Sequence, residues 1–167
     1  MTIDESEALR NLAGVEAIKQ LKARYFRTLD TKDWDGFRDV FTVDFVSDTR
    51  PSGGKRIEGR DDFLAFLAKA IGERGTLHQG HMPEIEVQSA MSATGVWAME
   101  DWVRFFPGIS LHGYGHYHET YRKEDGGWRI SSSTLTRVRQ DICLPFWTFH
   151  VSPRLQRRMQ RLATRDS

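Results

Sequence analysis

The chain has 167 residues and one cysteine, Cys143, so its length suits one ordinary domain and an internal disulfide is excluded. Its 24 Lys and Arg residues nearly balance its 23 Asp and Glu residues, which argues against nucleic acid and against an anionic membrane as partners. No apolar run approaches the ~20 residues of a membrane-spanning helix. The acidic start MTIDESEALR is also unlike a signal peptide, so we expect a globular, cytoplasmic protein.

The formal net charge of +1 hides an uneven distribution along the chain. Residues 1–62 and 63–136 each carry a net charge of −2, whereas residues 137–167 carry +5. The basic surplus predicts a single anionic group on an otherwise apolar substrate. In the tail, the same surplus is typical of a solvated helix or an oligomer contact, and also of an arm that binds an anion or a partner.

Hydrophobic periodicity predicts helices in the first half of the chain and strands in the second. Apolar residues recur every three or four positions over residues 14–29 and 63–71, with a short helix between them at residues 34–41. Residues 45–57 include a Pro and Gly turn and are expected to hold one or two strands. Alternation then predicts antiparallel strands near residues 84–87, 94–106, 112–122 and 128–139. Helices followed by a sheet indicate the α+β class.

We expect one domain at residues 1–144 and a distinct tail at residues 145–167. The tail opens with Phe146, Trp147 and Phe149. It continues after a proline as a predicted helix with five arginines: Arg154, Arg157, Arg158, Arg161 and Arg165.

One predicted strand places a carboxylate among apolar side chains. Because side chains alternate across a strand, Asp101 shares a face with Trp97, Met99 and Val103, which we expect to line a substrate pocket. A buried carboxylate needs a hydrogen-bond donor or a cation. Asp101 is therefore either a salt-bridged core residue or the group that orients a catalytic histidine.

Five of the six histidines lie between His78 and His118. His78 enters the strand before that of Asp101, and it is our candidate for the base that removes a proton from carbon next to a carbonyl. His112, His116 and His118 share one face of a later strand. We expect His116 and His118 to line the pocket, with a surface position or a metal-binding pair as the alternatives.

Three further polar residues are candidates for the same site. Tyr25 lies on the apolar face of the first helix, either as a core residue or as a hydrogen-bond donor to an enolate oxygen, and Asp30 follows at the end of that helix. Arg137 is predicted to face inward on the last strand and to need a carboxylate or a bound anion, with Arg139 as the alternative. The sequence has no phosphate-binding glycine loop, dinucleotide fingerprint, GxSxG or HExxH motif, so we expect no cofactor and no metal.

Several segments together resemble the SnoaL-like branch of the nuclear transport factor 2-like superfamily. They are LKARYFRTLDTKDWDGFRDVF, IEGRDDFLAFL, HQGHMPEIEV, WAMEDWV and DGGWRISSSTLTRVR, and the resemblance covers about residues 10–141. It implies a cone-shaped, cystatin-like fold in which N-terminal helices pack on a curved antiparallel sheet around one deep apolar pocket. It also implies a homodimer or homotrimer. Because the family includes dehydratases, isomerases, cyclases, hydrolases and binding proteins, the fold alone does not fix the reaction.

Within this family, the polar residues are most similar to those of the bile-acid 7α-dehydratase and, more distantly, the scytalone dehydratase type. The resemblance implies an active site made of Tyr25, Asp30, His78, Asp101 and Arg137.

The expected function is that of a cofactor-independent lyase acting on a hydrophobic, steroid-like or aromatic substrate. His78, oriented by Asp101, would remove a proton next to a carbonyl, and a hydroxyl would then leave. An isomerase or a carbon-carbon lyase with the same residue pair is one alternative. A non-catalytic protein that binds a small ligand is another.

Overall fold

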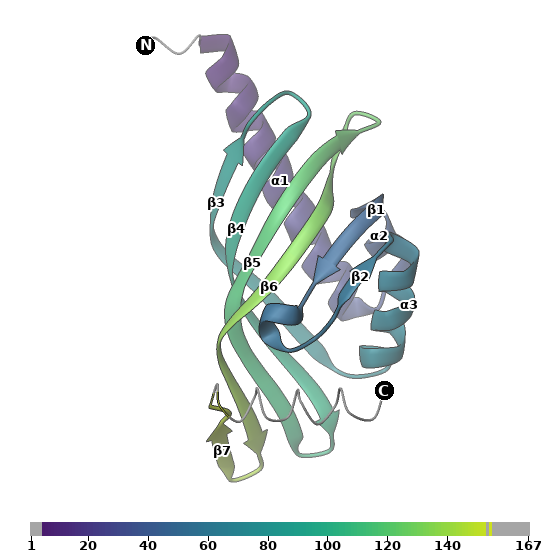
Figure 1. The fold of residues 1–167 in the computed structure, drawn as a ribbon, viewed down its shortest axis with the longest axis vertical. Helices are drawn as coiled ribbons and strands as arrows, with labels where there is room; N and C mark the ends of the chain where they lie inside the picture. Colours follow the sequence, from purple (N-terminus) through teal and green to yellow (C-terminus); the bar gives the residue numbers. More distant parts are fainter. Residues whose placement is uncertain (1–4, 153, 155–167) are drawn as a thin grey trace.

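The computed structural model describes residues 5–152 and residue 154, and it combines helices with one curved sheet (Figure 1). The helices are α1 (Glu5–Thr31), α2 (Trp34–Arg38) and α3 (Arg60–Ile71), with a short 3-10 helix at Arg50–Ser52. The strands are β1 (Phe41–Asp48), β2 (Arg56–Glu58), β3 (Thr76–Val87), β4 (Ser92–Phe106), β5 (Ile109–Glu124), β6 (Gly127–Leu144) and β7 (Trp147–His150). The predicted α+β class is confirmed.

The sheet has the strand order β2-β1-β6-β5-β4-β3, with β7 added on β6. Consecutive strands from β3 to β6 pair as antiparallel hairpins, as the alternating pattern predicted. The prediction of a purely antiparallel sheet is wrong in one place, because β1 runs parallel to β6. A parallel neighbour needs a long connection, and the whole of β3, β4 and β5 lies between β1 and β6 in the chain.

Helix α1 packs on one face of the long strands (Figure 1), and we call this face of the sheet the inner face. The inner face of the sheet carries His78, Asp101 and Tyr117. Residues Ile18, Leu21, Tyr25 and Leu29 of α1 are buried, and their spacing of three or four places them on one side of the helix. The helix starts earlier than its apolar pattern predicted. Its first turns carry the exposed Leu9 and Leu12, which do not join the core.

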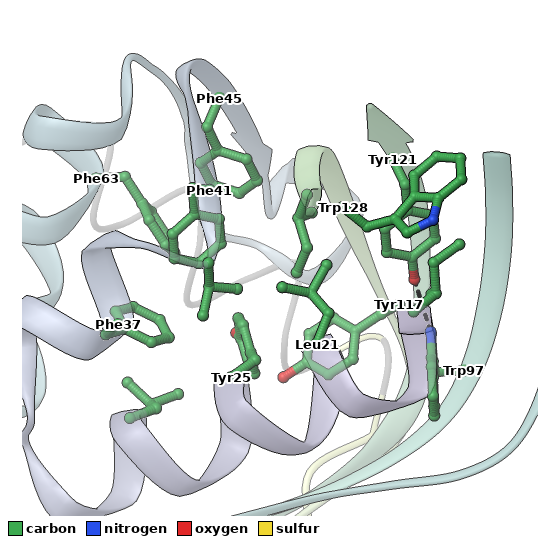
Figure 2. Packing of buried hydrophobic residues seen from close by; sticks show 14 of the residues in the cluster. Leu21, Tyr25, Phe37, Phe41, Phe45, Phe63, Trp97, Tyr117, Tyr121 and Trp128 are labelled. Carbon is green, nitrogen blue, oxygen red and sulfur yellow. Dashed lines mark hydrogen bonds between the residues drawn. The ribbon is translucent and has the colours of Figure 1, made fainter. Parts of the chain in front are cut away.

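A cluster of aromatic rings packs α2, α3 and β1 against α1. Phe41 of β1 lies 4.9 Å from Phe37, 4.4 Å from Phe45 and 5.5 Å from Phe63, measured between ring centroids, and Tyr25 of α1 packs against the same group (Figure 2). These rings come from α1, α2, β1 and α3, so the cluster fixes the short helices against the end of α1 that carries the polar residues described below.

Two local predictions differ from the structure. The second helix ends at Arg38, Val40 lies in the turn that follows, and Phe41 begins β1, where it pairs with Ile130 of β6. Residues 147–150 of the predicted tail form a strand on β6. The predicted Arg-rich helix lies outside the described residues except for Arg154.

No helix in the described part of the chain combines the length and the apolar character needed to cross a membrane.

Replacing Phe41 with Ala tests the aromatic cluster. The side chain is fully buried, so its loss leaves a cavity, and we expect the free energy of unfolding in a urea titration to fall by about 3–5 kcal/mol. The matched control is Val43→Ala on the same strand, where the side chain is 69% exposed and a change within about 0.5 kcal/mol is expected. Equal effects of the two substitutions would contradict the assigned core.

Candidate active site

His78 of β3 forms a closely hydrogen-bonded pair with Asp30 in the last turn of α1. The ring atom Nδ1 of His78 lies 2.7 Å from Oδ1 of Asp30, and the backbone N–H of His78 donates to Oδ2 at 2.7 Å. The hydroxyl of Thr76 donates to Oδ1 at 2.8 Å. Both side chains of the pair are largely buried, with 9% of His78 and 16% of Asp30 exposed. We call these two residues the dyad.

The charge of Asp30 sets the tautomer of His78. Burial would raise the pKa of Asp30, but the hydrogen bonds from His78 and Thr76 outweigh burial and hold its pKa below the ordinary value. An ionised carboxylate only accepts hydrogen bonds, so the neutral ring of His78 carries its proton on Nδ1 and a lone pair on Nε2. Among the described residues, nothing forms a hydrogen bond with Nε2.

Asp101 does not orient His78, and this part of the prediction is corrected. The two residues are direct cross-strand partners on β3 and β4, as expected. However, the carboxylate of Asp101 accepts two hydrogen bonds from Arg137 of β6, at 2.8 and 2.5 Å. The planar guanidinium offers two parallel donors to one carboxylate, which a single imidazole nitrogen cannot match.

A glycine makes the pair of Asp101 and Arg137 sterically feasible. The two residues lie on strands either side of β5, and the position of β5 opposite Asp101 is Gly113. A β-carbon at Gly113 would collide with both the guanidinium of Arg137 and the carboxylate of Asp101. Arg139, the alternative to Arg137, is 57% exposed at its side chain and pairs with Asp141 instead.

Two buried tyrosines lie close to the dyad and to the pair of Asp101 and Arg137. The ring centroids of Tyr25 and Tyr117 are 6.1 Å apart, and the charge of Asp30 acts on Tyr25 while that of Asp101 acts on Tyr117. Burial, followed by nearby negative charge, raises the pKa of both hydroxyls well above the ordinary value. Both tyrosines therefore stay protonated as hydrogen-bond donors. Tyr117 was missed from the sequence, although its spacing of four residues from Gly113, an even number, places it on the same inner face.

A buried ion pair beneath these tyrosines was also missed. Lys22 of α1 and Glu119 of β5 are both fully buried at their side chains, with Nζ and Oε1 2.5 Å apart. The Lys22 ammonium lies 4.1 Å from the ring centre of Tyr25 and 4.0 Å from that of Tyr117. The hydroxyl of Tyr121 donates to the second oxygen of Glu119 at 2.6 Å. Lys22 follows Ile18 by four residues and precedes Tyr25 by three, so the helical spacing could have placed it on the buried face of α1.

The residues expected to bind substrate divide between the two faces of the sheet. Trp97, Met99 and Val103 are buried on the inner face, and the indole N–H of Trp97 donates to the hydroxyl of Tyr121 at 2.8 Å (Figure 2). Trp97 is therefore a hydrogen-bonded core residue.

His116 and His118 do not line the inner face, which corrects the prediction. They pair with Ala98 and Val96, whose side chains point away from α1, and His118 is exposed. The alternation along β5 is regular, but the pairing of Gly113 with Asp101 decides which residues of β5 face α1. The sequence alone did not show this pairing.

The histidines on the other face of the sheet, which points away from α1, contact neighbouring side chains on that face. Nε2 of His112 lies 2.6 Å from Oε1 of Glu100, and the hydroxyl of Tyr114 lies 3.3 Å from Nδ1 of His112. Across residues 5–152, no group of three or more His, Cys, Asp or Glu side chains has the geometry to hold a metal ion.

A cavity of about 680 Å³ lies at the opposite end of α1 from the dyad. Residues between Glu7 and Arg24 of α1 form one wall, and the turns that follow β3 and β5 form the other. Neither member of the dyad lines it.

Removing one partner of the buried ion pair should strongly destabilise the fold. We expect Lys22→Met to lower the free energy of unfolding by about 3–5 kcal/mol, because Glu119 is then left as an unpaired buried charge. Lys22→Met combined with Glu119→Gln should recover much of that loss, since the amide oxygen still accepts from Tyr121. A double-mutant cycle in urea measures the coupling, and strictly additive effects would contradict it.

The dyad should also be visible in the pH dependence of stability. A carboxyl whose pKa is lower in the folded than in the unfolded state stabilises the fold above its unfolded pKa, and this contribution is lost as pH falls through the folded pKa. Asp30→Asn should therefore cost more stability at pH 7 than at pH 2.5, measured by urea unfolding at each pH. A cost that is the same at both values would show that the ionised carboxylate does not stabilise the fold.

Comparison with known proteins shows which proteins this chain is similar to. Probable cyclase FGR4 of Gibberella zeae is 25% identical over 138 residues, which cover 72% of this chain and 89% of that protein. A Novosphingobium aromaticivorans protein provisionally named scytalone dehydratase has a TM-score of 0.73 and 24% identity, covering 80% and 89% of the two chains. Hexachlorocyclohexane dehydrochlorinase LinA-type3 of Novosphingobium barchaimii has a TM-score of 0.69 and 17% identity, covering 87% and 95%.

These structures share the nuclear transport factor 2-like, or cystatin-like, fold with this protein. The match to the SnoaL-like domain family extends over residues 10–134, three quarters of the chain, and the chain therefore belongs to the SnoaL-like family.

Proposed function

We propose that this protein is a cofactor-independent lyase that begins its reaction by removing a proton from carbon next to a carbonyl. The observation that carries the proposal is the dyad, in which an ionised Asp30 holds Nδ1 of His78 and leaves Nε2 as the basic atom. A neutral imidazole held in one tautomer by a carboxylate is the arrangement used for general-base catalysis in many enzymes.

The proposed reaction is a dehydration. Nε2 of His78 takes the proton from the carbon, and the electrons of that C–H bond form a carbon-carbon double bond as the carbonyl oxygen becomes an enolate. The C=O bond then re-forms, the electron pair of the enolate double bond moves to form a new double bond to the neighbouring carbon, and the bond from that carbon to its hydroxyl breaks. The hydroxyl takes the proton that the His78 imidazolium holds and leaves as water, which returns His78 to its neutral form. Asp30 stabilises the imidazolium that exists between the two steps.

The two tyrosines supply the donors that an enolate requires. Burial keeps the hydroxyls of Tyr25 and Tyr117 protonated, and both lie in the apolar interior, where a hydrogen bond to developing negative charge is stronger than in water. We propose that Tyr25, Tyr117 or both hold the enolate oxygen.

The inner face favours a hydrophobic and locally uncharged substrate. Met99 and Val103 are apolar, and the charges of Asp101 and Arg137 are already paired with each other. An anionic group on the substrate would have to compete with Asp101 for both donor nitrogens of Arg137. This competition argues against the anionic substrate group that the basic surplus of the sequence predicted.

Related chemistries begin with the same proton transfer. A dehydrochlorinase removes hydrogen chloride, and a dehydratase removes water; in either elimination a base takes a proton from carbon. A double-bond isomerase or a carbon-carbon lyase is the second candidate, because the dyad defines the base and does not define the leaving group.

His78→Gln tests the proposed base. Wild-type protein incubated in D₂O with a panel of aromatic and steroid-like β-hydroxy ketones should exchange the proton next to the carbonyl and form the conjugated enone, followed by mass spectrometry and ultraviolet absorbance. We expect His78→Gln to reduce the rate by about 10²- to 10⁴-fold, the typical contribution of a general base.

The matched control is His81→Gln, which changes a histidine of the same strand whose side chain is 49% exposed, and it should retain wild-type turnover. Undiminished turnover by His78→Gln would exclude His78 as the base. Exchange with a shifted double bond and no loss of water would assign an isomerase. Ligand binding without any exchange in the wild type would assign a binding protein.

A further inference from the structure

The dyad is the inner part of a longer chain of hydrogen bonds. The ammonium of Lys32 donates to the hydroxyl of Thr76 at 2.6 Å, and that hydroxyl donates to Oδ1 of Asp30 at 2.8 Å. The same oxygen accepts from Nδ1 of His78. Each donor in this series of hydrogen bonds therefore directs its hydrogen toward the carboxylate of Asp30.

The conformation of Lys32 is unusual and is suited to this contact. Its φ angle is 60°, in the left-handed region of the backbone that residues other than Gly and Asn seldom adopt. The turn brings the ammonium back over the end of α1, where it also donates to the backbone carbonyl of Leu29 at 3.2 Å. Such a cation is favourable at the C-terminal end of a helix, and an uncapped end would be free to fray.

The ammonium of Lys32 is partly buried. Burial lowers the pKa of this ammonium, while the charges of Asp30 and Glu73 oppose that change. A charge that is partly removed from water acts more strongly on its neighbours than an exposed one.

From this geometry we propose that Lys32 and Thr76 are positioning residues for the dyad, in which Thr76 fixes the orientation of the Asp30 carboxylate and Lys32 favours the unprotonated form of His78. The inference rests on the function proposed above for its catalytic meaning. The hydrogen-bond chain itself can be tested without any substrate.

Other charged and titratable groups also face His78. Asp101 lies directly opposite on β4, with its charge paired to Arg137 of β6. Tyr25 and Tyr117 are protonated and add no net charge. Because Asp101 and Arg137 compensate each other, the balance between Asp30 and Lys32 dominates the field at the imidazole.

Three substitutions separate charge from hydrogen bonding. Lys32→Met removes the cation, and Lys32→Asn removes it with a residue that accepts the left-handed backbone, so that one of the two remains informative if the other fails to fold. Thr76→Val removes the hydroxyl at nearly constant shape. Each should stabilise the imidazolium of His78, because positive charge or a competing hydrogen bond on Asp30 has been removed.

The measurement is an NMR titration of the His78 ring in the full chain, together with the acid limb of the pH–rate profile once a substrate is found. We expect the midpoint of the His78 titration to move to higher pH by about 0.5–1 unit in all three variants. Lys32→Arg and Thr76→Ser keep the charge and the hydroxyl, and should restore the wild-type midpoint.

The matched controls are Lys69→Met on the exposed face of α3 and Thr31→Val, whose hydroxyl donates only to the backbone of its own helix. Neither should move the midpoint. Folded Lys32→Asn and Thr76→Val proteins with wild-type midpoints would overturn the proposal. A shifted midpoint alongside unimpaired turnover by His78→Gln would uphold the positioning chain and reject the catalytic role of the dyad.

Discussion

The carboxylate of Asp30 is the contact on which the site depends. It accepts hydrogen bonds from both the backbone and the ring of His78, so it fixes where α1 meets β3 and also which nitrogen of the ring is basic. A carboxylate near the C-terminal end of a helix is electrostatically unfavourable by itself. Donors from β3 and the ammonium of Lys32 over the helix end compensate for that position. The stability of this contact and the proposed chemistry of His78 therefore rest on the same hydrogen bonds.

Polar groups inside the curved sheet occur as compensated pairs. Lys22 is paired with Glu119, and Asp101 with Arg137, each joining elements that are distant in the chain. In surroundings of low dielectric an unpaired charge would be costly, and pairing lets the inner face hold ionised groups among aromatic rings. The interior therefore holds several charged groups whose charges nearly cancel, which supports the proposal of an uncharged ring compound as the substrate.

The sequence predicted that Asp101 lies on a buried face close to His78, but it misassigned the hydrogen-bond partners of both residues. Alternation placed Asp101 on a buried face beside Trp97, and the register confirms that His78 lies opposite Asp101. The role of orienting His78 was assigned to the wrong carboxylate, because Asp30 and His78 are 48 residues apart in the chain and no local pattern describes a contact over that separation. His116 and His118 were placed on the wrong face, since a one-residue change of phase moves a strand's side chains to the other side.

By itself, the sequence determined the α+β class, the helical face of α1 and the alternating strands, because these follow from periodicities of three to four residues and of two. Only the tertiary structure decided the partners: Asp30 for His78, Arg137 for Asp101 and Glu119 for Lys22. It also decided that β1 joins the sheet in parallel. The reason is that hydrogen bonds between distant elements depend on register and on the crossing of helix and sheet, which are set by packing of the whole chain.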